Sequence, residues 1–381
     1  MESLLLQPAA LLSLALAFGG FFTTVLVFLL VLGIVVLVHE LGHFLAAKSV
    51  GIRVERFSIG FPPRLLGVKV GDTDYCLSAI PIGGYVKMSG MIDETTLDSD
   101  QAAGSVTGAP WEFMSKGFWA KTFAISAGVL MNFLLAIAIF STQAYRDGYQ
   151  EVVDASATVG RLEPGAPAEK AGLQPGDRIV AIDGQPVEAW GEMTSLIQAG
   201  AGELELTLER GGREHSVKLT PERRQIPDVE SGQMLERSII GIQPQTRHVQ
   251  PNLLQAVGLG FEQTWYWTRL VLGTVARLIS GEASVKELGG PIVIAQISQQ
   301  SYSRGWAELF HFIAVLSVNL GLLNLFPIPA LDGGHLVIIG LEALMRRPLS
   351  SRMRLVIQQV GMVMLLLLMA LVMYNDVLRQ L

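Results

Sequence analysis

Two histidines four positions apart, His39 and His43, lie in the segment His39-Glu40-Leu41-Gly42-His43. Residues at positions i and i+4 share one face of a helix, so both imidazoles can bind the same metal ion. A zinc hydrolase needs three protein ligands, one open position and a carboxylate that accepts a proton from water. Glu40 has the usual place of that carboxylate. The pattern predicts a catalytic zinc centre; the alternative is a helix that carries two coincidental histidines.

The two histidines lie at the end of a long apolar stretch. Residues 21–38 contain no charge and are long enough to cross a bilayer. An ionisable side chain at that depth costs about 2.5–3.5 kcal/mol on insertion scales, and a bound metal would offset this cost. We therefore expect a membrane span at 21–47. Residues 4–17 are expected to extend the span or to lie at the interface, with Gly19-Gly20 as a potential break.

A second polar motif adjoins another apolar block: Asn324-Leu325-Phe326-Pro327-Ile328-Pro329-Ala330-Leu331-Asp332-Gly333-Gly334. Its prolines interrupt helical structure, and its glycines allow another segment to approach closely. Asp332 is one of few carboxylates beside an apolar block on the side of the membrane where the histidines are expected. It is therefore the best candidate for the third zinc ligand, and the alternative is an Asp that caps a helix.

The composition excludes several classes of protein. Half of the 381 residues are hydrophobic and 16% are charged, and the apolar residues are gathered in blocks, as in a multi-span membrane protein. A net charge of −6 gives no broad basic surface for nucleic acid. The single cysteine, Cys76, rules out an internal disulfide and a multi-cysteine zinc site, and is expected to be buried.

Three further apolar blocks, at 118–140, 310–326 and 355–373, are predicted to be spans. Lysines and arginines follow the first span and arginines separate the last two, so both links are expected in the cytoplasm. Both termini and residues 142–305 would then lie outside. His215 and His248 in this outer segment, and His311 at the outer end of a span, are expected to be too far from the metal. His335 is expected either to support the ligands or to be structural.

Between the first two spans, residues 52–90 have the composition of short β-hairpins, with strands at 54–59 and 75–80. Residues 93–108 are polar and are expected to form a flexible loop. Residues 253–279 mix apolar side chains with charges and tryptophans, which favours an interfacial amphipathic helix over a buried span.

The outer segment contains Ala171-Gly172-Leu173-Gln174-Pro175-Gly176-Asp177-Arg178-Ile179, followed by strand-like stretches at 203–209 and 215–219. Over roughly residues 150–245 it resembles a bacterial PDZ domain, a fold that captures extended peptides as an added strand. Residues 239–242 resemble the strand and carboxylate loop of a circularly permuted member. The resemblance makes Ile240 and Gly241 candidate peptide-binding residues; the alternative is a rigid spacer of the same fold.

Taken together, the motifs resemble the site-2 protease family nearly end to end, and within it the bacterial RseP type. Gly83-Gly84-Tyr85-Val86 and Leu288-Gly289-Gly290-Pro291-Ile292 also match. The resemblance implies that His39, His43 and Asp332 bind zinc and that Glu40 is the catalytic base. It further implies that Asn324 contacts the substrate backbone or the oxyanion, and that the hairpin with Gly83 and Gly84 holds substrate as a strand. The best-known relatives carry two tandem PDZ domains, whereas this chain has one.

The expected fold is therefore a multi-span α-helical membrane protein of about four transmembrane helices, with a cytoplasmic-side membrane-associated β-hairpin element and an extracytoplasmic α+β PDZ domain. The expected segments are 1–51 (first span and zinc motif), 52–117 (hairpins and loop), 118–141 (second span), 142–250 (PDZ domain), 251–305 (interfacial helices), 306–345 (third span and aspartate motif) and 346–381 (basic loop and fourth span).

The expected function is intramembrane zinc proteolysis in the bacterial cytoplasmic (inner) membrane, with the active site in the bilayer towards the cytoplasm. The family implies single-span substrates of the anti-sigma-factor type, first cut by an upstream site-1 type protease, and remnant signal peptides. Membrane lipid is an expected partner and nucleic acid is not. The alternative is a non-catalytic membrane adaptor that binds peptide C-termini through its PDZ domain. A secreted soluble zinc protease is disfavoured, because removal of a leader would discard the zinc motif.

Overall fold

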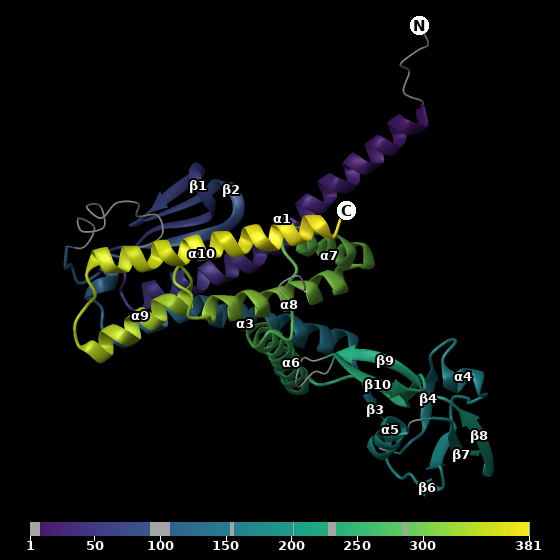
Figure 1. The fold of residues 1–381 in the computed structure, drawn as a ribbon. Coiled ribbons are helices and arrows are strands. Elements are labelled where there is room, and N and C mark those ends of the chain that lie inside the picture. The colour runs from purple at the N-terminus through teal and green to yellow at the C-terminus, as the bar shows by residue number, and fades with distance from the viewer. Residues whose placement is uncertain are drawn as a thin grey trace. The chain divides into compact units, whose positions relative to one another are not determined.

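The computed structural model describes residues 8–91, 107–152, 156–200, 202–227, 234–284 and 288–380. The chain divides into two compact units, each described here by itself (Figure 1). The first comprises Met1–Ser141, Leu259–Val271 and Leu278–Leu381, and the second comprises Thr142–Gly258 with Leu272–Arg277. The flexible loop predicted at 93–108 lies almost wholly outside the described residues.

Among the described residues, four helices are long and apolar enough to cross a membrane, at the four places where spans were predicted. They are α1 (Pro8–Ser49), α3 (Phe118–Asp147), α8 (Trp306–Leu325) and α10 (Ser351–Leu378). Helix α1 continues without interruption through Gly19-Gly20, so the break considered there is absent. Two glycines cost about 1 kcal/mol each relative to Ala, too little to end a helix flanked by strong helix formers.

The remaining helices that belong wholly or partly to the first unit are shorter or more polar. They are the 3₁₀ turn η1 (Phe113–Ser115), α6 (Leu253–Ser280), α7 (Pro291–Arg304) and α9 (Asp332–Met345). Helix α6 has 28 residues but is not among the candidate spans, and it exposes Leu254, Phe261 and Trp265. The predicted amphipathic helix is therefore confirmed as a helix, and its position at the membrane interface stays a prediction.

Helix α8 is packed by both α1 and α3. Val27, Val31 and Val35 recur every four residues on α1 and form a buried cluster with Leu309 and Ile313. A second buried cluster joins α3 to the opposite part of α8 through Ala136, Phe140, Ala314, Val318 and Leu322. Packing of small and branched side chains is the main source of cohesion between helices in lipid. Helix α10 instead exposes many apolar side chains, as expected of a lipid-facing helix.

The last turn of α10 is joined to the start of α7. Asp376, which is fully buried, accepts hydrogen bonds from the backbone amides of Gly290, Ile292 and Val293 at 3.0, 3.1 and 3.3 Å. These are the amides that the first turn of a helix leaves without partners, and a carboxylate there is also favoured by the helix dipole. The matched motif at 288–292 is thus the anchored start of α7.

The predicted hairpins form one antiparallel sheet from two long, bent strands, β1 (Val54–Val70) and β2 (Thr73–Met88). Residues 56–59 pair with 84–87 on one side and with 74–77 on the other, and 74–77 also pair with 66–69. Residues 84–87 and 66–69 are therefore the two outer segments. Leu65, Leu66 and Val68 are 57–69% exposed.

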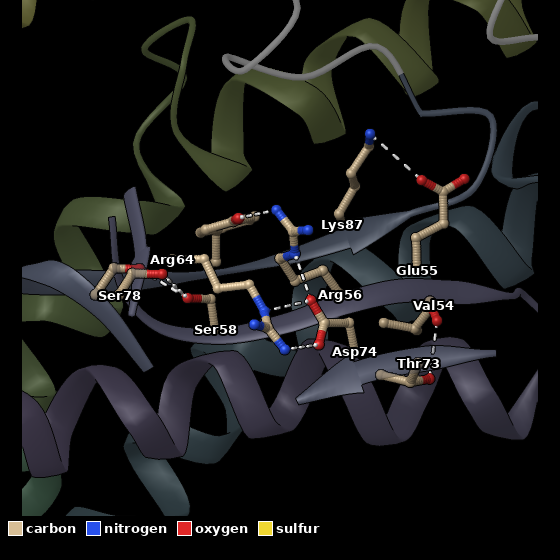
Figure 2. A network of polar contacts seen from close by, with 11 residues as sticks. Val54, Glu55, Arg56, Ser58, Arg64, Thr73, Asp74, Ser78 and Lys87 are labelled. Carbon is tan, nitrogen blue, oxygen red and sulfur yellow. Dashed lines mark hydrogen bonds and ion pairs between the residues drawn. The ribbon is translucent and has the colours of Figure 1, made fainter. Parts of the chain in front are cut away.

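A polar network holds this sheet in register (Figure 2). Asp74 accepts hydrogen bonds from Arg56 at 3.2 Å and from Arg64 at 3.1 Å. The bonds and charge of Arg64, supplemented by Arg56, hold the pKa of the Asp74 carboxyl below its usual value. Ser58 and Ser78 share a 2.8 Å hydrogen bond between the same strands. Cys76 is buried in the sheet, as predicted.

The second unit is rich in β-structure. A four-stranded antiparallel sheet has the order β6-β5-β7-β8, and three two-stranded pairs are β4 with β11, β9 with β10, and β3 with β12. The strands are β3 (Tyr149–Val152), β4 (Val159–Leu162), β5 (Arg178–Ile182), β6 (Gln185–Pro186), β7 (Leu204–Arg210), β8 (Arg213–Leu219), β9 (Glu222–Pro227), β10 (Met234–Ile239), β11 (Ile242–Pro244) and β12 (Thr246–Val249). The helices are α4 (Pro167–Lys170) and α5 (Trp190–Ala199). The two strands predicted at 203–209 and 215–219 are confirmed.

One buried carboxylate in this unit is held by an ion pair with a partly exposed arginine. Asp177 is 1% exposed and accepts hydrogen bonds from the Arg210 guanidinium at 2.6 and 2.7 Å and from the backbone amide of Gln174 at 2.7 Å. Burial alone disfavours the ionised carboxyl, but these bonds outweigh burial and hold the pKa of Asp177 below its usual value. The chain itself satisfies this buried charge.

Candidate metal centre

Three predicted ligands converge in the first unit. The Nε2 atoms of His39 and His43 on α1 are 3.1 Å apart, and Oδ2 of Asp332 is 3.1 Å from the former and 3.3 Å from the latter. Both histidines are 6% exposed. Among the described residues, these three form the one group of histidine, cysteine and acidic side chains that could hold a metal ion.

The donor set fits zinc. Ligand atoms at about 2.0–2.2 Å from a tetrahedral zinc ion are roughly 3.3 Å from one another, close to the separations observed here. Oδ2 of Asp332 is buried and has no hydrogen-bond partner, which is costly unless a ligand satisfies it. The alternative of a capping Asp is not supported, since Asp332 is the first residue of α9 and the cap position, Leu331, has no side-chain cap bond.

The proline-rich turn before Asp332 determines where this carboxylate lies. Helix α8 ends at Leu325, because Pro327 and Pro329 cannot continue it. The first turn of α9 then packs directly on this turn. A Cβ atom on Gly333 would lie 2.2 Å from the carbonyl oxygen of Phe326, so only glycine permits that approach.

Helix α3 contributes three positions that sequence reasoning missed. Gly128 leaves room for both imidazoles, because a Cβ atom there would lie 2.3 Å from Nε2 of His43. One turn earlier the carbonyl oxygen of Ala124 is 2.9 Å from Nδ1 of His43. One turn later the side-chain amide of Asn132 is 3.2 Å from Nδ1 of His39. The available signal was a small or polar residue at every fourth position of an apolar span.

A cavity of about 620 Å³ opens beside the three donors. Its lining includes the predicted base Glu40, the predicted contacts Asn324, Gly83 and Gly84, and residues of α10, namely Met362, Leu365, Leu366 and Met369. The carboxylate of Glu40 accepts a hydrogen bond from the backbone amide of Val86. The Asn324 side-chain nitrogen is 3.2 Å from Nε2 of His39. His335 lines the cavity without belonging to the donor group.

The other predicted residues lie elsewhere. Ile240 and Gly241 connect β10 to β11 in the second unit, where they line a separate cavity of about 230 Å³. His215 and His248 are on β8 and β12 of that unit. His311 packs against Phe140 and Trp267 with ring centroids 5.2 and 6.0 Å apart.

Comparison with known proteins agrees with a zinc site. The model of peptidase family M50 matches residues 27–368. The zinc metalloprotease RasP of Geobacillus kaustophilus is 31% identical over 423 residues, an alignment that covers 93% of this chain and 97% of that protein. A relative from Agrobacterium fabrum, also named as a zinc metalloprotease, is 37% identical over 370 residues, with 94% and 97% covered. This chain therefore belongs to the M50 peptidases, the family of site-2 proteases, and is a zinc metalloprotease.

Proposed function

We propose that this protein is an intramembrane endopeptidase that cuts single-span membrane proteins within or near their membrane segment. The observation that carries the proposal is the convergence of His39, His43 and Asp332 on helices that belong to, or directly follow, candidate spans. The proposed substrates are of the anti-sigma-factor type, first trimmed by a site-1 type protease, together with remnant signal peptides.

In this proposal His39, His43 and Asp332 hold the zinc ion. When bound, zinc polarises the scissile carbonyl and acidifies water, so that hydroxide is available at neutral pH. Glu40 takes the proton from the attacking water and returns it to the leaving amine. Because Glu40 follows His39 directly and lines the same cavity, a proton acceptor is available beside the donor group.

Asn324 is proposed to stabilise the developing oxyanion. It lies in the last turn of α8 beside the donor group, and its amide nitrogen is 3.2 Å from Nε2 of His39. A neutral N–H donor at this place can bind the substrate carbonyl oxygen as it gains charge. Removal of such a donor costs about 2.7–4 kcal/mol of transition-state stabilisation where it has been measured.

The substrate is proposed to bind as a strand along residues 84–87. A helical substrate shields its carbonyl groups in hydrogen bonds, so it must unwind before it is cut. Among the described residues, 84–87 pair only with 56–59, and Gly84, Tyr85 and Val86 line the cavity. An outer segment of this kind can accept a further strand. A Cβ atom on Gly84 would lie 3.2 Å from Cγ of Glu40, so glycine leaves the space between base and sheet open.

The second unit is proposed to be a single PDZ domain that selects substrates. Its smaller cavity is lined on one side by Trp190, Met193 and Ile197 of α5, and on the other by residues 238–243. An apolar groove between a helix and a strand can take the C-terminus of a cut protein. We place this domain and both termini outside the bacterial cytoplasmic membrane, with the sheet of β1 and β2 on the cytoplasmic side.

The protease is tested by cleavage of a tagged single-span substrate in proteoliposomes, with wild type, zinc-stripped enzyme and Glu40→Gln compared and zinc content measured on the same samples. We expect cleavage to be lost on stripping, to return with zinc, and to be absent in a Glu40→Gln protein that still holds zinc. Equal cleavage by wild type and Glu40→Gln would refute the role of Glu40. Peptide binding with no zinc-dependent cleavage of any substrate would favour the adaptor.

The selection role is tested by Gly241→Ala against Gly165→Ala. Both glycines have a φ of +76°, but a Cβ atom on Gly241 would lie 2.1 Å from Cβ of Ala166, whereas Gly165 faces open space. Both variants should keep zinc. We measure the preference of each variant for a trimmed over an untrimmed substrate, and we expect only Gly241→Ala to change it. The same preference in both variants would contradict a role for this groove.

A further inference from the structure

The face of α3 that meets the two histidines contacts each imidazole at Nδ1, the ring nitrogen that does not face the donor group. Ala124, Gly128 and Asn132 are spaced by four residues, as are His39 and His43, so the two helix faces run alongside each other. Nδ1 of His43 is 2.9 Å from the carbonyl oxygen of Ala124. A carbonyl oxygen can only accept, so Nδ1 of His43 carries the proton. Its Nε2 therefore has a free lone pair directed at the donor group.

For His39 the partner is the carboxamide of Asn132, which is fully buried. With the amide nitrogen towards His39, Oδ1 of Asn132 is left without a hydrogen-bond partner. In that orientation Nδ1 of His39 would accept, and the proton on Nε2 would prevent metal binding. A half-turn of the carboxamide exchanges its oxygen and nitrogen, and the hydrogen-bond network decides between the two orientations. With the oxygen towards His39, Nδ1 donates and Nε2 is free.

Asn132 is also fixed in place from the other side. Its backbone carbonyl accepts a 2.9 Å hydrogen bond from the buried hydroxyl of Ser317 on α8. Gly321, one turn further along α8, is so close that a Cβ atom there would lie 3.3 Å from Cβ of Asn132. These two contacts fix the backbone position from which the carboxamide reaches His39.

We propose that Asn132 is a positioning residue for the metal centre, whose carboxamide oxygen holds His39 in the Nδ1–H form with Nε2 directed at the metal. The proposal rests on zinc ligation by His39. Metal-binding histidines commonly donate their second N–H to such a partner, and loss of the partner typically lowers metal affinity about 10–100-fold. A neutral amide does this without adding a charge inside the membrane, where a carboxylate would be costly.

The test is zinc affinity, measured by chelator competition on the full-length protein in detergent. Asn132→Leu keeps most of the volume and removes the acceptor, whereas Asn132→Asp keeps an oxygen acceptor and cannot supply the amide nitrogen. We expect the affinity to fall about 10–100-fold in Asn132→Leu and to stay within a few-fold of wild type in Asn132→Asp. The control is Asn319→Ala, because its carboxamide binds the Val315 carbonyl within α8, so the affinity should not change.

The visible absorption of the Co²⁺-loaded protein gives a second readout, because it reports ligand geometry independently of activity. It should change in Asn132→Leu and be retained in Asn132→Asp. Wild-type affinity in Asn132→Leu, or an equal loss in Asn132→Leu and Asn132→Asp, would overturn the proposal. His39→Ala separates the two levels of the argument: if it kept zinc, ligation by His39 itself would be wrong, whatever the Asn132 variants show.

Discussion

Asp177 in the second unit and Asp332 in the first both place carboxylate oxygens in the protein interior, and the two differ in whether the chain satisfies the charge. Asp177 in the second unit is satisfied by Arg210 and a backbone amide. Asp332 in the first unit directs a partnerless buried oxygen at two imidazoles. A buried charge that the chain satisfies contributes to structure, whereas one left unsatisfied is a cost that only a ligand recovers. The hydrogen bonding of a buried carboxylate thus distinguishes an aspartate that stabilises the fold from one that is available to a ligand.

The largest effect is expected for Asp332→Ala. Removal of a direct ligand should cost more than the roughly 10–100-fold in zinc affinity that supporting residues cost, and cleavage should disappear. Because its oxygen lacks a partner, the zinc-free variant should unfold no more easily than zinc-free wild type. Zinc content and thermal unfolding with and without chelator measure both. A zinc-free Asp332→Ala that unfolds at a clearly lower temperature would break the contrast.

For Asp177→Ala we expect a smaller effect, and one on stability instead of zinc binding. It leaves the Gln174 amide and Arg210 without their acceptor, and Arg210 is 33% exposed, so water recovers part of the loss. We expect a loss of about 1–3 kcal/mol in the stability of the second unit. Zinc content should not change. Urea unfolding of the full chain, monitored by susceptibility to proteolysis, measures this loss of stability.

The matched control for this variant is Asp147→Ala, whose ion pair with Arg146 is exposed on both sides. Such pairs contribute about 0–1 kcal/mol. Equal stabilities of Asp177→Ala and Asp147→Ala would show that the buried pair is not structural.

The smallest effect is a dependence on pH. The pKa of Asp177 is depressed in the folded protein, so its stabilisation is complete above the unfolded value of about 3.9 and is lost as pH falls through the folded value. Wild type should therefore lose stability in the second unit below about pH 4 more steeply than Asp177→Asn, which has no such proton to bind. Unfolding midpoints from pH 3 to 7 would reveal the difference, and parallel curves would contradict it.

The sequence predicted those features that have a local signature. Continuous apolar runs located the four spans, the i and i+4 spacing identified His39 and His43, and prolines beside an acid identified Asp332. The missed features depend on distant pairing. The partner of His43 is a backbone carbonyl 81 residues away, which no side-chain pattern encodes. Asp376 was not singled out from the sequence, because its amide partners are 83–86 residues earlier.

The register of β1 and β2 could not be predicted from the sequence either. The strand composition predicted strands at 54–59 and 75–80, but the observed strands are longer, and residues 56–59 pair on both sides. Alternation shows which face of a strand is buried and says little about which neighbours flank it. Only the pairing revealed that residues 84–87 form an outer segment beside the cavity.

The residues of the candidate metal centre are far apart along the chain, so translation produces them in a fixed order with long intervals. His39 is made first. Asn132 is 93 residues after His39, and Asn324, just before Asp332, is 285 residues after His39. At roughly 5–20 residues per second, translation takes about 15–60 s to cover the longer interval. With the proposed ligand set, the nascent chain carries the two histidines throughout that time without the third ligand, Asp332. We therefore expect the incomplete chain to be inactive, and activity to begin only once α8 and the turn after it have been made.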